Sequence, residues 1–501
     1  MFRLPRFAGL AVGFALALVA PVLRAEIYEI FPSDANQTCD EEFENLANDL
    51  LPGDELILHG GIYTQSCRRA ITVNGTPEEP IVIRAAAGER PVLTRPADNI
   101  DLHNNIEIED SSWVTFRGLT FQGGSIGVRF IRGSNIRFVG NEIHETGANA
   151  LSMNSGDCDA FTLRRNHIHD TGLSTSGPTE GEGMYIGCNN DTCRTTNSVI
   201  EGNYIHHLTA TSGGGNDGIE VKPGSHGNIV RHNVIHDTNI GTEYPCIFVY
   251  GGGDGQNIVD GNLLWNCGEA IQVVSDAVVR NNLILSSSIH GITAAPHAQV
   301  SGIKDVEIVN NTIFGHPKCL YVRWSGATGV TLANNAVYCG GDTAVDGSGL
   351  SGPEVTVSAN YVEGALSGVS IDDKAFFDGG AAAAAFVDPE RGDFWPAPGS
   401  PLIGAADALE AALRDFNARL RVAPADVGAY ESDGVAANPC WQPEAGFKQP
   451  CSQPIAVEGD SRTTAPTISS FSTAARAPTP RSGTTTSPPI PGRPTPGRTP
   501  R

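Results

Sequence analysis

Short apolar strands separated by polar turns recur along most of the chain. Nine short segments begin with Asn and carry an apolar residue two positions later, and they start 20 to 37 residues apart. Their first residues are Asn141, Asn166, Asn203, Asn233, Asn262, Asn282, Asn311, Asn335 and Asn360. A second short apolar strand that begins with Gly, Ala or Cys follows in most repeats, as at 218–221 and 246–249. This periodicity is typical of a solenoid.

Each repeat has a single apolar face, which it cannot bury alone. Stacking the repeats into a coil buries a continuous core and pairs each strand with the turns before and after it. A leucine-rich repeat lacks support because its Leu-x-x-Leu-x-Leu pattern is absent, and a propeller would need longer repeats and blade signatures. We therefore predict an all-β fold, a single-stranded right-handed parallel β-helix. The repeated Asn suits a turn with left-handed backbone and a side-chain ladder.

The two ends of such a coil must be closed because an open turn exposes a sheet edge. Residues 40–50 have the amphipathic pattern of a short helix, which we expect to cap the N-terminal end. Residues 406–420 also have a helical pattern, and they precede the segment 425–431 (ADVGAYE). We expect this second region to close the other end.

The chain divides into four segments by composition. Residues 1–25 carry Arg3 and Arg6 before a short apolar run, which predicts a signal peptide, with a retained anchor as the alternative. The β-helix is expected over 26–435, followed by a disulfide-containing extension over 436–458. Residues 459–501 are rich in Ser, Thr and Pro and should be disordered. We expect a secreted protein without a membrane span in its mature form, which the tail could attach to a cell surface.

Eleven cysteines agree with an exported, oxidised protein. Their positions suggest the pairs Cys39–Cys67, Cys188–Cys193, Cys246–Cys267, Cys319–Cys339 and Cys440–Cys451. Cys158 is then left over, or it pairs with Cys188 or Cys193. No spacing of Cys and His indicates a zinc site.

The formal net charge of −23 argues against a nucleic-acid partner, whose phosphates require a basic surface. The same charge disfavours an acidic sugar polymer unless a cation is bound.

The opening of the predicted coil carries a family resemblance. The segments 51–63 (LPGDELILHGGIY), 75–85 (GTPEEPIVIRA) and 88–93 (GERPVL) resemble the first turns of the pectate-lyase-like superfamily, in its chondroitinase-B and alginate-lyase type. The similarity in repeat pattern extends to about Glu431. It implies a β-helix that acts on an extracellular polysaccharide, although such motifs indicate the architecture more than the chemistry.

The segment 216–222 (NDGIEVK) holds the candidate catalytic residues. Alternate side chains of a strand point to opposite sides, so Ile219 and Val221 should enter the core. Glu220 and Lys222 should then project from a solvent-facing turn, with Asp217 at the start of the strand. Proton abstraction beside a uronate carboxylate requires a base and a stabilising positive charge, often Ca²⁺ held by carboxylates.

Neighbouring repeats extend this patch. Their alignment places Glu182 next to Asp217, Tyr185 and Phe248 next to Glu220, and Tyr250 next to Lys222. The family resemblance implies that Lys222 is the base and that Asp217 binds calcium, and we add Glu182 and Glu220 as further ligands. Resembling lyases carry an arginine where this chain has Tyr250, which can donate a proton but cannot neutralise a uronate. An unremarkable surface ion pair is the competing interpretation.

Four aromatic and basic side chains are candidates for sugar contacts: Tyr185, Phe248, Tyr321 and Arg323. Their rings could also stack only on one another. The histidines His144, His169, His206 and His236 recur in register and predict a surface ladder, with a metal-binding stripe as the alternative.

The favoured function is a calcium-assisted polysaccharide lyase that cleaves by β-elimination, acting as a monomer. A polygalacturonase-like hydrolase is the alternative, with Asp217 paired with Glu220 or Glu182. Against it, Asn216 replaces the first aspartate of that family's pair and no Gly-His-Gly motif follows. A C5-epimerase would share proton abstraction, but an Asp-Pro-His-Asp motif is absent. A non-catalytic carbohydrate-binding protein is the third possibility.

Overall fold

The computed structural model describes residues 25–32, 42–95, 102–210, 215–238, 244–372, 374–449 and 451. These residues belong to one compact unit that extends to residue 452. Residues 1–24 of the predicted signal peptide, the predicted tail at 459–501 and Cys39 lie outside the described residues.

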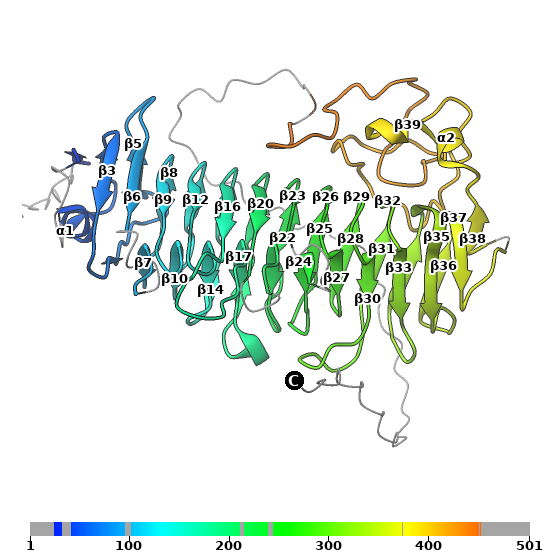
Figure 1. Ribbon diagram of the computed structural model, residues 1–501, viewed down its shortest axis with the longest axis horizontal. Coiled ribbons are helices and arrows are strands. Elements are labelled where there is room, and N and C mark those ends of the chain that lie inside the picture. Colours follow the sequence, from blue (N-terminus) through cyan, green and yellow to red (C-terminus); the bar gives the residue numbers. More distant parts are fainter. Residues whose placement is uncertain are drawn as a thin grey trace, which may run out of the picture. The chain divides into compact units, whose positions relative to one another are not determined.

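Parallel strands stack in three ladders along a coil (Figure 1). Ladder 1 contains β1 (Ile27–Ile30), β2 (Glu55–Leu58), β5 (Ile81–Ala85), β8 (Val114–Arg117), β11 (Arg137–Val139), β15 (Thr162–Arg164), β19 (Val199–Glu201), β22 (Ile229–Arg231), β25 (Asn257–Asp260), β28 (Ala277–Arg280), β31 (Val306–Val309), β34 (Val330–Ala333) and β36 (Val355–Ser358). Ladder 2 contains β3 (Gly61–Thr64), β6 (Pro91–Thr94), β9 (Thr120–Gln122), β12 (Glu142–His144), β16 (His167–Thr171), β20 (Tyr204–Leu208), β23 (Val234–His236), β26 (Leu263–Trp265), β29 (Leu283–Leu285), β32 (Thr312–Phe314), β35 (Ala336–Ser348), β37 (Asn360–Ser367) and β38 (Phe376–Asp378).

In each turn of the coil the chain passes through ladder 1, then ladder 2, then ladder 3. Ladder 3 carries the predicted catalytic segment. It contains β4 (Ala70–Ile71), β7 (Ile106–Glu109), β10 (Val128–Ile131), β13 (Leu151–Met153), β17 (Met184–Ile186), β21 (Ile219–Val221), β24 (Pro245–Val249), β27 (Glu269–Val273), β30 (His290–Ala294) and β33 (Lys318–Arg323). The long strands β35 and β37 pass from ladder 2 into ladder 3, where β35 pairs with β33. A short pair, β14 (Cys158–Asp159) and β18 (Thr195–Thr196), lies between ladders 3 and 1. The predicted parallel β-helix is confirmed.

The core of the coil is a continuous apolar column. One side chain in two along each strand points inward, as the alternation predicts. Ile219 and Val221 are fully buried in this column, and the rings of Phe130 and Phe138 meet edge to face at 5.8 Å within it. Stacking thereby buries the apolar face that no single repeat could cover.

The repeated asparagines form a buried ladder inside the turn that precedes ladder 2. The Asn233 Oδ1 accepts the backbone N–H of Asn203 at 2.9 Å, and the Asn233 Nδ2 donates to the carbonyl of Ile200 at 3.0 Å. The expectation that these asparagines adopt left-handed backbone is wrong. The residue before each one does so instead, as at Arg165 (φ 53°) and His232 (φ 56°). The hydrogen bonds of the Asn side chain therefore stabilise the turn, and the preceding residue adopts the left-handed backbone that changes the chain direction.

The N-terminal end is closed as predicted. Helix α1 (Glu42–Asp49) buries Phe43 and Ala47 against the first turns of the core. Its Glu44 carboxylate accepts the backbone N–H of Ala70 at 2.8 Å, which satisfies a donor at the open edge of β4. No helix in the described part of the chain has the length and apolarity needed to cross a bilayer.

The predicted helix at 406–420 does not form. Backbone groups there bond to asparagines of the coil: Ala412 N–H donates to the Asn310 Oδ1 at 2.9 Å, and Asp407 N–H donates to the Asn334 Oδ1 at 2.7 Å. Ala418 also has a left-handed backbone, with φ 61°. These tertiary hydrogen bonds replace the i to i−4 bonds that a helix would make.

Instead of capping the far end of the coil, the C-terminal region folds back over the outer face of ladder 2 (Figure 1). It contains α2 (Ala382–Ala385), β39 (Phe386–Asp388), the 3₁₀ turn η3 (Pro389–Arg391) and β40 (Asp393–Pro396). Here Phe394 packs on Phe314 of the coil in a second apolar core, with ring centroids 5.0 Å apart. The region extends into the predicted extension, where the Lys448 Nζ donates to the Gly261 carbonyl at 2.7 Å.

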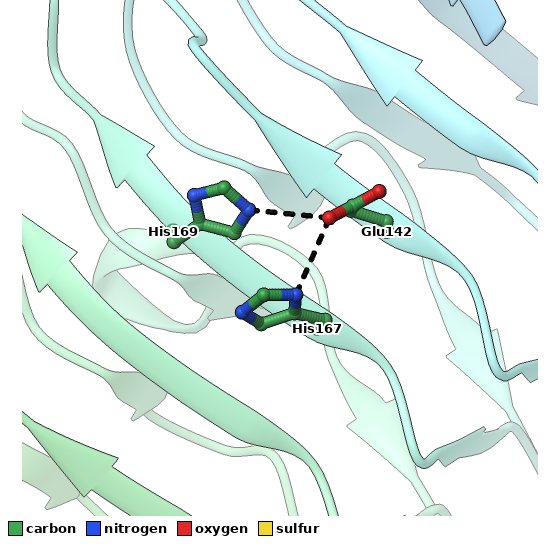
Figure 2. Close-up of side chains that lie close together, drawn as sticks. All are labelled: Glu142, His167 and His169. Atoms are coloured by element: carbon green, nitrogen blue, oxygen red, sulfur yellow. Dashed lines mark hydrogen bonds and ion pairs between the residues drawn. The ribbon is translucent and has the colours of Figure 1, made fainter. Parts of the chain in front are cut away.

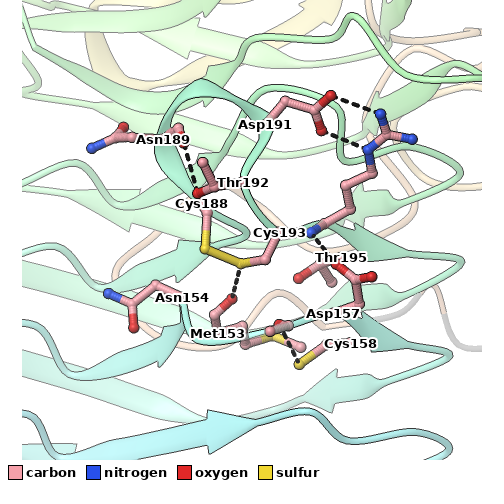
Figure 3. Close-up of a disulfide and its surroundings, with 12 residues drawn as sticks. Met153, Asn154, Asp157, Cys158, Cys188, Asn189, Asp191, Thr192, Cys193 and Thr195 are labelled. Carbon is pink, nitrogen blue, oxygen red and sulfur yellow. Dashed lines mark hydrogen bonds and ion pairs between the residues drawn. A yellow bond between two sulfur atoms is a disulfide. The ribbon is translucent and has the colours of Figure 1, made fainter.

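Four of the predicted disulfides are present: Cys188–Cys193, Cys246–Cys267, Cys319–Cys339 and Cys440–Cys451. Cys188 and Cys193 flank the 3₁₀ turn η2 (Asn189–Asp191) (Figure 3). Cys158 is buried and unpaired beside that disulfide, so the alternative pairing with Cys188 or Cys193 is not adopted. The predicted partner of Cys67, Cys39, lies outside the described residues.

Candidate functional site

The register of ladder 3 brings the predicted residues together. Glu220 on β21 pairs with Tyr185 on β17 and with Phe248 on β24. Two positions further along the β21–β24 pairing, the Lys222 Nζ lies 5.2 Å from the ring centroid of Tyr250. The Gly183 N–H donates to the Asp217 carbonyl at 2.9 Å, which places the preceding Glu182 on the turn next to Asp217. The alignment made from the repeats is confirmed at these positions.

The expectation that this turn faces solvent is wrong. Glu220 and Lys222 point away from the core as predicted, but each is only 4% exposed. Tyr185, Phe248 and Tyr250 are buried as well, so the aromatic rings are not open platforms. Alternation along a strand sets the direction of a side chain, but it does not show what other segments cover it.

Part of the cover comes from residues 295–305, which connect β30 to β31. His297 meets the rings of Tyr250 and Phe248 edge to face, with centroids 4.9 and 5.6 Å away. Val300 packs against the same small apolar cluster. The Gln299 Oε1 accepts the Asn190 N–H at 3.0 Å, which joins this connection to η2.

Lys222 lies at the centre of the buried cluster. Its Nζ donates to the Glu220 Oε1 and lies 4.2 Å from the ring centroid of Tyr185 and 5.2 Å from that of Tyr250. The Tyr250 hydroxyl donates to the same Glu220 oxygen at 3.2 Å. Ring faces attract a cation, so the two tyrosines and the carboxylate together hold the ammonium group away from water.

The carboxylates of this cluster have perturbed acidities. Burial raises the pKa of Glu182 well above its usual 4.5, and the nearby charges of Glu220 and Asp217 raise it further. Burial also raises the pKa of Glu220, against the opposing effects of Lys222 and Tyr250. The Oε2 atoms of Glu182 and Glu220 are buried without a hydrogen-bond partner among the residues that the structure describes. Unpartnered buried carboxylates of this kind cluster at functional sites.

Glu182, Asp217 and Glu220 do not fit the predicted calcium site. Calcium requires several oxygen ligands that converge at 2.3–2.6 Å from the ion. Among the residues that the structure describes, the one group of three ligating side chains whose donor atoms lie within 4.8 Å of one another is elsewhere. In addition, the Glu220 Oε1 already accepts hydrogen bonds from Lys222 and Tyr250. The expected calcium set is therefore not assembled here.

Tyr321 and Arg323, the other predicted sugar contacts, lie on β33, three strands further along ladder 3 than β24. Both are half-buried. The Arg323 guanidinium lies 3.9 Å from the Tyr321 ring centroid and bonds to the Asp346 carboxylate at 2.9 Å. His290 stacks on the same tyrosine at 4.8 Å. They form a separate packed group, apart from the cluster around Lys222.

His297 and Gln299 were not predicted to contribute to the site, because they lie in a connection that matches no repeat. The available signal was length: the chain uses eleven residues, 295–305, between β30 and β31, whereas β27 and β28 are joined by three. Long connections between strands often form binding loops or cover side chains on the outer face. Their contacts could not be predicted without the register of the coil.

Replacing Glu182 with Gln should stabilise the protein at neutral pH. A carboxyl whose folded pKa is raised contributes stability below its unfolded pKa, and this stability is lost as the pH rises through the folded pKa. A glutamine side chain does not ionise, so Glu182→Gln avoids that loss. The free energy of unfolding of the variant should exceed that of the wild type by about 1–3 kcal/mol at neutral pH, and the difference should vanish near the pKa that Glu182 has in the unfolded chain. Denaturant unfolding across this range measures the difference. The exposed Glu180→Gln is the control, and an equal gain there would contradict the assignment.

A family model described as "Right handed beta helix region" matches residues 104–284 and 180–337. No curated protein matches the sequence. A solved pectate lyase, Pel9A, is 16% identical over 81% of this chain and 96% of its own, with a TM-score of 0.49. An alginate lyase from Paenibacillus sp. str. FPU-7 is 19% identical over 56% of this chain and 93% of its own (TM-score 0.45). The catalytic domain of a GH87 α-1,3-glucanase is 14% identical over 68% of each chain (TM-score 0.42).

These solved structures include both lyases and a glucanase, and none of them assigns a reaction to this chain. The family-model match and the ladders of parallel strands agree on the architecture. The chain is a right-handed parallel β-helix.

Proposed function

We propose that this protein is a secreted polysaccharide lyase that cleaves a uronate-containing polymer at the cluster around Lys222. The observation that carries the proposal is a group of ionisable side chains buried on three successive turns, in which one carboxylate oxygen each of Glu182 and Glu220 has no hydrogen-bond partner in the described part of the chain. Burying charged groups is costly unless a function retains them.

The β-helix itself does not require this cluster. The outward position held by Tyr185 and Glu220 is occupied by Ser152 on β13, by Gln272 on β27 and by Thr293 on β30. Those turns stack equally well with neutral side chains. The buried charges gather on and beside β21, with Glu182 just before β17, and this local concentration supports a chemical role.

The residues of the cluster supply the parts that β-elimination needs. A proton passed from the Lys222 ammonium to Glu220 leaves a free amine, which removes the proton from C5 of the uronate. The electron pair forms the C4–C5 double bond as the C4–O bond breaks, and Tyr250 protonates the departing oxygen. Glu182 in its protonated form donates a hydrogen bond to the uronate carboxylate, a role that a carboxyl with a raised pKa can fill. Because His297 and Val300 cover the cluster, the proposal requires residues 295–305 to move aside before a polymer can reach these groups.

A glycoside hydrolase is the second candidate because the raised pKa of Glu182 also suits a general acid. Asp217 on the neighbouring turn would then be its partner carboxylate. The two reactions give different products from the same polymer. Elimination creates an unsaturated uronate that absorbs in the ultraviolet, whereas hydrolysis creates reducing ends without that absorbance.

The test is a screen of the purified mature protein on uronate polymers, with added Ca²⁺ and with a chelator. We expect ultraviolet absorbance to rise together with new reducing ends, and to rise equally in both conditions because the carboxylates do not form a calcium set. Reducing ends without absorbance would replace the lyase with a hydrolase. Binding to a polymer without either product would contradict both and indicate a carbohydrate-binding protein.

A further inference from the structure

A second cluster of chemically active side chains lies on ladder 2, away from the strands that carry Lys222. Imidazoles stack along its outer face, with ring centroids 5.0 Å apart between His144 and His169 and 5.3 Å apart between His169 and His206. The stack continues through His236 to Trp265. The predicted histidine ladder therefore forms. One of its members, His169, also converges with two side chains outside the ladder, Glu142 and His167.

We propose that Glu142, His167 and His169 form a binding site for a divalent transition-metal ion such as Zn²⁺. The strand geometry creates the site: His167 and His169 are two residues apart on β16 and share a face, and Glu142 on β12 pairs with His167. Figure 2 shows the three side chains turned toward one another. Two histidines and a carboxylate are a known ligand set for zinc with a fourth position open to water.

The three donor atoms lie within 4.8 Å of one another, and two of their distances match the spacing that such an ion requires. The Glu142 Oε1 lies 3.3 Å from the His167 Nδ1 and 3.4 Å from the His169 Nε2. Two ligands of a tetrahedral zinc ion, each about 2.1 Å from the metal, lie about 3.4 Å apart. The side chains of Glu142, His167 and His169 retain 23, 31 and 16% exposure, so an ion can reach them from solvent.

Each ligand also has an outer hydrogen-bond partner that would orient it. The His169 Nδ1 lies 2.7 Å from the Asp170 carboxylate, and the His167 Nε2 lies 2.9 Å from the His206 Nε2. The second oxygen of Glu142 accepts a hydrogen bond from the Thr120 hydroxyl at 3.2 Å. Metal-binding histidines usually donate their other N–H to a carboxylate, carbonyl or water, and such partners fix the ring and the tautomer. The arrangement therefore goes beyond three chance neighbours.

The experiment measures Zn²⁺ binding to the full mature chain by titration calorimetry, together with the visible absorbance of bound Co²⁺. We expect one ion per chain and a tetrahedral cobalt spectrum. Loss of an outer partner alone costs about 10–100-fold in metal affinity, so Glu142→Gln and His167→Gln should each weaken binding at least that much. Asp170→Asn leaves all three ligands in place and should weaken metal binding about 10–100-fold. This variant tests the proposed site even if a ligand variant misfolds.

His236→Gln is the matched control, because His236 belongs to the same stack but not to the group of three. It should bind zinc as the wild type does. An equal loss in His236→Gln would indicate weak binding along the whole histidine stack and would overturn the three-ligand site. Unchanged affinity in Glu142→Gln and Asp170→Asn would overturn it as well. The outcome is independent of the lyase proposal, since the readout is binding of the ion rather than cleavage of a polymer.

Discussion

Lys222→Ala should lower the rate of uronate-polymer cleavage by about 100- to 10 000-fold, the usual contribution of a general base. The proposal gives Lys222 the proton of C5, and the structure describes no other lysine in contact with Glu220. The loss should fall on kcat, because the amine acts on the reacting carbon and not on the distant sugars. Initial rates of ultraviolet absorbance over a range of polymer concentrations measure it.

Lys222→Ala also leaves the Glu220 carboxylate buried without its cation, which can cost about 3–5 kcal/mol of stability. The double variant Lys222→Met/Glu220→Gln removes both charges and should fold normally while remaining inactive. Lys304→Met is the matched control, since Lys304 forms an ion pair with Asp276 at 3.0 Å on another part of the coil. A folded double variant with wild-type kcat would refute the role of Lys222.

The fold could be predicted from the sequence because the repeat itself carries the information. Period-two alternation sets which side chains enter the core, and the recurring asparagine marks one turn in every repeat. The C-terminal region was less predictable. Its helical pattern at 406–420 competed with tertiary hydrogen bonds to Asn310 and Asn334, which no local pattern reveals.

The candidate site was predicted in part for the same reason. Register between repeats follows from aligning them, so the neighbours Tyr185, Glu220 and Phe248 were placed correctly. Burial depends on segments outside the repeat, and His297 therefore could not be placed above Tyr250. The metal-ligating group illustrates a further limit: its histidines are visible in the sequence, but only the rotamers of His167 and His169 bring their nitrogens toward Glu142.

Arg421→Met should destabilise the protein by about 3–5 kcal/mol, the range found when one partner of a buried ion pair is removed. Arg421 is buried in the folded-back C-terminal region, and its guanidinium donates to the Gly428 carbonyl at 2.7 Å and to the Asn281 Oδ1 of the coil at 3.0 Å. It also pairs with the buried Glu431 at 3.4 Å, so the substitution removes the cation beside this carboxylate as well as a donor to backbone carbonyls.

The folded-back region should detach first in Arg421→Met, because this side chain joins it to the coil. Limited proteolysis should then cut within this region before the coil, and denaturant unfolding should begin at a lower concentration than in the wild type. Arg421→Lys keeps the charge but loses the planar fork of donors, and we expect an intermediate loss. Arg391→Met is the control, since the Arg391 side chain is 86% exposed and its ion pair with Asp388 contributes little. If Arg421→Met and Arg391→Met unfold alike, the stability of the folded-back region rests on its apolar contacts with ladder 2 and not on this buried guanidinium.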